Sequence, residues 1–226
     1  DLGSFILVHH GERLLTDPGH SCYRNLIHGL ESSSQTHNTC TFLVERESLG
    51  LQEDLAKATL LEQKSVLPRR LIQDGKPGPP VERGSRLLIC ERDEPVSVVG
   101  AEIASAYGSP IQRFSRLWLL AGSHVLFVVD TIEASRPVTT VWNWLVNHRD
   151  GQTVAESHAG LLTVRRHGAG LKLWAGGTVT GSHPVYGYVH DAYHVEPAQR
   201  GEGRPGSGLL FRFTENGAKE TRTVVH

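Results

Sequence analysis

The sequence of 226 residues contains no methionine, only three cysteines and no run of about 20 apolar residues. A membrane-spanning helix needs a run of that length, so no such span is expected. The 23 Lys and Arg residues nearly balance the 24 Asp and Glu residues, which leaves a net charge of -1. A chain with so little excess charge offers no electrostatic argument for nucleic acid or an anionic membrane as a partner, and neither is expected.

The three cysteines, Cys22, Cys40 and Cys90, are odd in number and lack the C-x-x-C spacing. They therefore indicate neither a disulfide framework nor a cysteine metal site. Small buried thiols are the favoured interpretation, and a bridge between Cys22 and Cys40 stays open for an exported protein. Because the chain starts at Asp1 with no methionine and no signal-like segment, we interpret it as part of a longer polypeptide.

Short runs rich in Val, Ile, Leu, Trp and Phe alternate with turn residues along most of the chain. The first two runs, residues 4–10 and 13–16, predict a hairpin with a two-residue turn at Gly11-Glu12. Turns are also predicted at Gly122-Ser123 and at Asn216-Gly217. The pattern predicts an all-β fold, a large antiparallel β-sandwich. Its further predicted strands are residues 39–44, 87–90, 95–103, 113–120, 124–130, 138–146, 161–166, 171–174, 209–213 and 221–225.

Residues 46–80 differ from the rest of the chain. Ser48 is a candidate cap for a short helix, and residues 74–80 (DGKPGPP) predict an exposed loop. We interpret residues 46–80 as an insertion in a single domain that covers residues 1–226. The apolar positions of the predicted helix are Leu51, Leu55, Ala58 and Leu61.

Asp17 and His37 are the two residues that merit attention as a site. Asp17 ends the first predicted hairpin, and His37 precedes the strand that follows it. Twenty residues separate them, so only the tertiary fold could make them neighbours. Taken by themselves, an Asp in D-P-G and a His before a strand favour turn and strand-entry roles over a metal site.

The order and approximate spacing of several motifs resemble the heparinase II/III-type polysaccharide lyases. The motifs are DLGSF (residues 1–5), LLTDPG (14–19), Tyr23 and SQTHNT (34–39), with weaker similarity at VVGAEIASAY (98–107), FSRLW (114–118), VVDTIEA (128–134) and VWNW (141–144). The resemblance covers residues 1 to about 170. Residues 46–80 and the tail match poorly.

The resemblance implies the C-terminal β-sandwich of an enzyme whose N-terminal α/α toroid is absent from this chain. It implies a divalent metal, usually zinc, with Asp17 and His37 as two ligands and a histidine upstream of Asp1 as the third. Tyr23 matches a tyrosine that could assist at the leaving oxygen or along the substrate, although a packed tyrosine is an equal alternative. The implied reaction is β-elimination in uronate-containing anionic polysaccharides, in a periplasmic or secreted protein.

Two other functions stay open at this point. The domain could be a non-catalytic carbohydrate-binding or scaffold sandwich, or part of a uronate C5-epimerase, which abstracts the same proton. Other candidate residues favour ordinary roles: core packing for Trp142 and Trp144, solvated surface charge for the pairs at 69–70 and 165–166, and no metal for the histidines at 183, 190 and 194.

Overall fold

The computed structural model describes residues 2–18, 33–45, 58–63, 72–73, 76–77, 85–148, 150–158, 160–176, 180–188, 208–218 and 222–225. These residues form antiparallel sheets and two short 3₁₀ turns, η1 (Ser34–Thr36) and η2 (Ala104–Ala106). None of the helical segments in these ranges has the length and apolar character needed to cross a membrane. The prediction of an all-β, antiparallel fold is confirmed.

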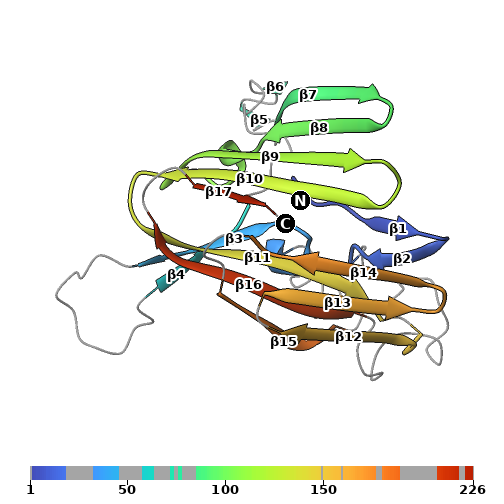
Figure 1. Ribbon diagram of the computed structural model, residues 1–226. Helices are drawn as coiled ribbons and strands as arrows, with labels where there is room; N and C mark the ends of the chain where they lie inside the picture. Colours follow the sequence, from blue (N-terminus) through green and yellow to red (C-terminus); the bar gives the residue numbers. More distant parts are fainter. Residues whose placement is uncertain are drawn as a thin grey trace.

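The strands form two larger sheets, a three-stranded sheet and a short pair (Figure 1). The seven-stranded sheet contains β1 (Leu7–His9), β2 (Glu12–Leu15), β3 (Cys40–Glu45), β4 (Ala58–Leu61), β11 (Val138–Asn147), β15 (Thr180–Tyr188) and β16 (Gly208–Ala218). The five-stranded sheet has the order β17 (Arg222–Val225), β10 (Val125–Ala134), β9 (Ile111–Ala121), β8 (Val96–Glu102) and β7 (Arg86–Asp93). The others are β12 (Thr153–His158), β13 (Leu161–Arg166) and β14 (Ala169–Trp174), and the pair β5 (Ile72–Gln73) and β6 (Lys76–Pro77).

The main core lies between the inner faces of the seven-stranded and five-stranded sheets. Phe42, Tyr107 and Phe114 form an aromatic group there, with ring centroids 5.0–5.9 Å apart. Trp142 and Trp144 alternate along β11 and are both fully buried, so the predicted core role is confirmed and neither is open to a sugar. β11 is buried on both faces because other parts of the chain cover each side, which explains why apolar residues occupy the successive positions 144–146.

The first hairpin has a different turn from the predicted one. β1 pairs with β2 so that His9 faces Glu12, and the turn residues are therefore His10 and Gly11 rather than Gly11 and Glu12. Both turn residues have positive φ, 48° and 77°, as a type I′ turn requires. Glycine takes the second turn position and histidine tolerates the first.

The hairpin predicted at Asn216-Gly217 is wrong. β16 continues through both residues to Ala218 and stays paired with β11 as far as Val138, with a register shift near that end. β17 then joins β10 in the other sheet. The long partner strand β11 extends β16 past a local turn signal, and the extra residue is absorbed as a bulge.

The prediction of a helix within residues 46–80 is wrong at the C-terminal end of that helix. Ala58 and Leu61 belong to β4, which pairs with β3. Pairing with β3 satisfies the backbone of this apolar run, so tertiary context overrides the helical spacing. Leu51 and Leu55 lie outside the described residues, and the interpretation of 46–80 as an insertion stays a prediction.

Cys40 is a free, fully buried thiol, whereas Cys90 is free and exposed on the edge strand β7. The expectation of a buried thiol is therefore confirmed for Cys40 and wrong for Cys90. Because Cys40 is a free thiol, it forms no bridge to Cys22, which lies outside the described residues. Burial raises the pKa of the Cys40 thiol well above its ordinary value, so it stays protonated and unreactive.

Candidate metal centre

One edge of β11 is shared by two strands that are distant in sequence. Leu15 of β2 pairs with Val146, and Cys40 of β3 pairs with Trp142. Both strands are antiparallel to β11, so they run in the same direction along its edge. The end of β2 and the start of β3 therefore meet beside residues 143–145, and the chain between them leaves the sheet and returns at nearly the same point.

The side chain of Asn38 holds the end of β2 and the start of β3 beside β11. Its side-chain amide donates to the carbonyl oxygens of Phe5 (2.7 Å) and Thr16 (2.8 Å), and its Oδ1 accepts from the Leu145 backbone N–H (2.7 Å). Asn38 is fully buried. A single side chain thus holds three separate segments together, and each of its hydrogen bonds satisfies a backbone group that would be costly to leave unpaired.

This arrangement brings Asp17 and His37 together. The Nε2 atom of His37 lies 3.5 Å from Oδ2 of Asp17, with the imidazole nearly buried (4% exposed) and the carboxylate half exposed (46%). Nδ1 of His37 lies 2.8 Å from the carbonyl oxygen of Ser33, which caps the η1 turn. A carbonyl can only accept, so Nδ1 donates to Ser33, and in the neutral ring Nε2 then presents its lone pair toward Asp17.

The pair fits the donor requirements of zinc. Histidine ligands commonly donate their second ring N–H to a backbone carbonyl, as His37 does to Ser33. Two ligand atoms on one tetrahedral zinc ion, each about 2.0–2.1 Å from the metal, lie about 3.3 Å apart, close to the separation seen here. Burial lowers the pKa of His37, although the hydrogen bond to Ser33 and the charge of Asp17 oppose this, and the neutral form that binds metals is favoured.

Two ligands do not complete a zinc site. Within the described ranges, no group of three or more His, Cys, Asp or Glu side chains is placed to hold a metal ion. The predicted site residue Tyr23 lies outside the described residues, as does Asp1, next to which the resemblance places the third ligand. The assignment of Asp17 and His37 as metal ligands therefore stays a prediction, and the geometry of the pair fits it.

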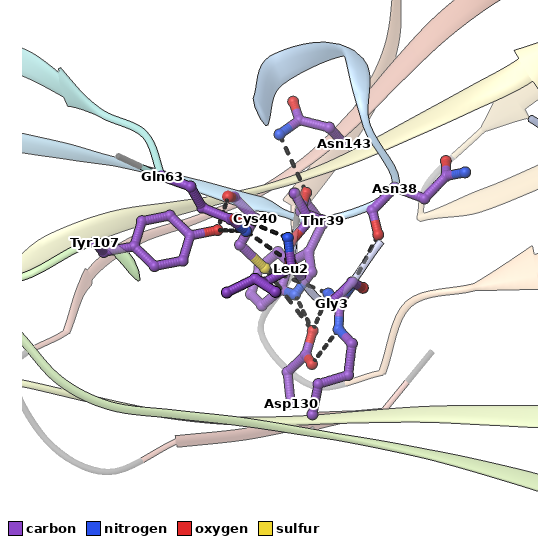
Figure 2. A network of polar contacts seen from close by, with 11 residues as sticks. Leu2, Gly3, Asn38, Thr39, Cys40, Gln63, Tyr107, Asp130 and Asn143 are labelled. Atoms are coloured by element: carbon purple, nitrogen blue, oxygen red, sulfur yellow. Dashed lines mark hydrogen bonds and ion pairs between the residues drawn. The ribbon is translucent and has the colours of Figure 1, made fainter. Parts of the chain in front are cut away.

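A buried polar network supports the loop of His37 from the side of the five-stranded sheet (Figure 2). Arg116 Nη1 donates to the carbonyl oxygens of Asn38 and Gly3, both at 2.8 Å. Its Nε and Nη2 atoms pair with the two carboxylate oxygens of Asp130 at 2.7 and 2.6 Å. Arg116 and Asp130 are both fully buried. Their ion pair joins β9 to β10, and the Nη1 contact of Arg116 joins these strands to Asn38, the residue that follows His37.

The segment after β4 also reaches the centre. Glu62 accepts a hydrogen bond from the Ser33 hydroxyl, and the Gln63 backbone N–H donates to Ser34 Oγ at 3.2 Å. The Gln63 side chain exchanges hydrogen bonds with the backbone of Leu2 at 2.6 and 2.7 Å. Residues at the end of β4 thus fix both the η1 turn and the start of the chain.

Arg212 is a neighbour of the site that the sequence analysis missed. On β16 it lies opposite Asn143, its Nε donates to Asn143 Oδ1 at 3.1 Å, and its Nη2 donates to Gln35 Oε1 at 3.0 Å. Gln35 is two residues before His37, so a guanidinium group lies near the centre. Only the β11–β16 register reveals this position, because Arg212 is 175 residues from His37 in the sequence.

A pocket of about 590 Å³ lies elsewhere, toward the β1–β2 and β9–β10 hairpins. Its lining is largely apolar, with His9, Ser123, His124 and Lys172 among the polar contributors, and it includes neither Asp17 nor His37. The candidate centre is therefore defined by its donor atoms and hydrogen bonds and not by this cavity.

Residues 1–223 match the family model described as heparinase II/III-like, C-terminal. The chain belongs to the heparinase II/III-like C-terminal family. No curated protein matches the sequence. Family membership confirms the resemblance carried by the motifs around Asp17 and His37.

Solved structures of this family share the fold. A mutant of the heparan sulfate lyase HepC from Pedobacter heparinus matches with a TM-score of 0.65 at 15% identity, covering 100% of this chain and 30% of that one. The heparinase III BT4657 gene product matches with a TM-score of 0.66 at 14% identity, covering 100% and 29%. This chain thus spans about 30% of the length of these relatives, which contain further domains.

Proposed function

We propose that this chain is the β-sandwich part of a polysaccharide lyase that cleaves uronate-containing anionic polysaccharides by β-elimination. The proposal includes a zinc ion, or another divalent cation, held by Asp17, His37 and a third ligand that precedes Asp1 in the full-length protein. It also includes an N-terminal α/α toroid as the partner domain and a periplasmic or secreted location. Membership in the family supports the reaction class.

The observation that carries the proposal is the 3.5 Å approach of His37 Nε2 to Asp17 Oδ2. These residues belong to two motifs that residues 18–36 separate in the sequence, yet their donor atoms converge. The hydrogen bond from Nδ1 to Ser33 orients the ring for this contact. When bound, zinc would join the end of β2 to the start of β3 and add positive charge beside an anionic substrate.

Elimination at a 4-linked uronate sets three requirements. A base removes the C5 proton, positive groups or hydrogen-bond donors stabilise the charge that develops on the carboxylate, and an acid protonates the leaving oxygen. Among the described residues, Arg212 is a cation that the fold brings near the centre, and it is our candidate for binding the substrate carboxylate. Tyr23 is our candidate for assistance at the leaving oxygen.

The full-length protein provides the test of the reaction. With zinc present, we expect it to release unsaturated uronates from at least one member of a panel of heparan sulfate, other glycosaminoglycans and alginate, measured by ultraviolet absorbance. Exchange of the C5 hydrogen with deuterated solvent without chain cleavage would instead indicate an epimerase. Absence of both signals on all polymers would contradict the catalytic proposal and leave a carbohydrate-binding sandwich.

We expect His37→Ala in the full-length protein to weaken zinc affinity about 100-fold or more, because loss of even an outer-shell partner costs about 10–100-fold. The melting temperature should fall with the zinc content, since a bound metal stabilises only the folded state. Metal analysis and thermal unfolding, with and without a chelator, measure both effects.

His124→Ala is the matched control for this substitution. His124 is exposed on the turn between β9 and β10 and lies in the pocket lining, away from Asp17. This variant should retain its zinc and melt as the unmodified protein does. An unchanged zinc stoichiometry in His37→Ala would remove His37 from the metal site.

A further inference from the structure

We propose that the exposed face of the three-stranded sheet is a second binding surface for an anionic polysaccharide, centred on Trp174. This surface, the Trp174 face, consists of Trp174, Lys172, Leu161, Thr163, Arg165, Val154, Glu156 and His158. The inference rests on the proposed function for the choice of polymer, but it concerns binding at a different place from the metal centre.

Side chains alternate strictly between two sides of this sheet. Leu162, Val164 and Leu173 are buried, whereas Arg165, Lys172 and Trp174 are exposed. Strands β13 and β14 contact β2, and among the described residues the side chains on the other side of the sheet are the exposed ones. Trp174 is 65% exposed, the largest exposure among the large apolar side chains of the described residues, while Trp142 and Trp144 are fully buried.

The register places polar and cationic groups around the indole. Trp174 faces Leu161, which in turn faces His158, and Lys172 faces Thr163, which in turn faces Glu156. Directly opposite side chains in such a sheet have Cβ atoms about 4.5–5.5 Å apart, and positions two residues along a strand lie on the same side. Indole, ammonium and hydroxyl groups therefore form one continuous patch.

Charge on the patch favours an anionic ligand. Lys172 and Arg165 are cations, and the one carboxylate, Glu156, lies 3.8 Å from Arg165 with both side chains mostly exposed. A pair that is exposed and that long contributes little, so Arg165 can exchange Glu156 for a carboxylate or sulfate of a polymer. A pyranose can stack its C–H groups on the flat indole while the neighbouring cations bind its anionic groups.

The composition of this face also argues against a buried protein interface. The exposed face of the five-stranded sheet has an apolar centre that includes Leu117, Leu119, Phe127 and Val129. The Trp174 face instead mixes its apolar side chains, Trp174, Leu161 and Val154, with charged and hydroxyl groups on each of its strands. Burial of those charges against an apolar domain would be costly, whereas a hydrated acidic sugar would pair with them.

The test uses the 226-residue chain with heparan sulfate and alginate as anionic probes and dextran as a neutral one. We expect Trp174→Ala to weaken binding of at least one anionic polymer about tenfold, measured by calorimetry. The polymer should also protect tryptophan fluorescence from acrylamide, because Trp174 is the well-exposed indole. Lys172→Gln with Arg165→Gln should reduce the salt dependence of binding.

Controls separate this surface from the metal centre. Phe127→Ala removes an exposed aromatic ring on the five-stranded sheet (40% exposed) and should leave binding unchanged. Binding is measured directly and with a chelator present, so failure of the metal proposal would not affect this result. Equal affinity of Trp174→Ala and the unmodified chain, no measurable binding of either anionic polymer, or equally tight binding of dextran would overturn the proposal.

Discussion

Replacing Asp130 by alanine is expected to destabilise the folded chain by about 3–5 kcal/mol, the usual effect of removing one partner of a buried ion pair. Arg116 is fully buried, and its Nε and Nη2 atoms both donate to Asp130. Trp142 Nε1 donates to the same carboxylate at 2.9 Å. Alanine would therefore leave a buried cation without its counter-ion and an indole N–H without its acceptor.

Denaturant unfolding of the 226-residue chain measures this effect, with the slope of the transition compared between variants. The control is the double replacement Arg116→Met with Asp130→Leu, which removes both charges and fills the space with apolar atoms. Such replacements are often neutral or stabilising, so much of the lost stability should return. A single Asp130→Ala variant that unfolds at the same denaturant concentration as the unmodified chain would contradict the importance of the pair.

The same pair also connects stability to the candidate centre. Arg116 reaches across the core to the backbone of Gly3 and of Asn38, and Asn38 directly follows His37. The ion pair lies in the five-stranded sheet, whereas Asp17 and His37 belong to the edge of the seven-stranded sheet. The position of the metal-binding loop therefore depends on the packing of the two sheets and not only on local sequence.

Most of the strands could be predicted from the sequence because apolar runs occur where the strands lie. The runs at 113–120 and 138–146 lie within β9 and β11, and the run at 124–130 begins one residue before β10. The turn predicted at Gly122-Ser123 lies between β9 and β10, but the observed register is what places Arg116 opposite Asp130. Val125 pairs with Ala121 beyond that turn, and counting five residues back along each strand gives the ion pair.

The strands that the sequence did not predict have weak local signals. β12 is largely polar on its exposed side, and β15 is rich in Gly, Tyr and His. Each forms because a partner strand supplies hydrogen bonds, β13 for β12 and β16 for β15. Such pairings are set by tertiary context and have no short-range signature.

The residues of the candidate centre also differ in how far the sequence could predict them. Asp17 and His37 could be selected from the sequence through the family motifs, but their approach depends on β2 and β3 sharing one edge of β11. Asn38 lies in the SQTHNT motif and Arg212 in none, but only the β11 hydrogen bonds and the β11–β16 register show what these two side chains contact. Long-range register is the information that a single sequence did not supply here.

Phe114→Ala is expected to cost about 3–5 kcal/mol, because a fully buried phenyl ring would be replaced by a cavity. Its ring packs 5.9 Å from Phe42 and 5.8 Å from Tyr107, and the Arg116 guanidinium lies 5.6 Å from its centroid. The neighbours belong to both sheets, so the sandwich cannot close the space by a local shift. At about 2–4 °C per kcal/mol for a chain of this size, the melting temperature should fall by roughly 6–20 °C.

Phe127→Ala makes the same chemical change on the neighbouring strand of the same sheet. Phe127 is on β10 with its ring on the exposed side (40% exposed), so its truncation opens no enclosed cavity. Its effect should stay within about 1 kcal/mol, near the range of surface substitutions. Calorimetric melting of the two variants side by side gives the comparison, and similar losses in both would show that the aromatic group between the sheets is not the main source of stability.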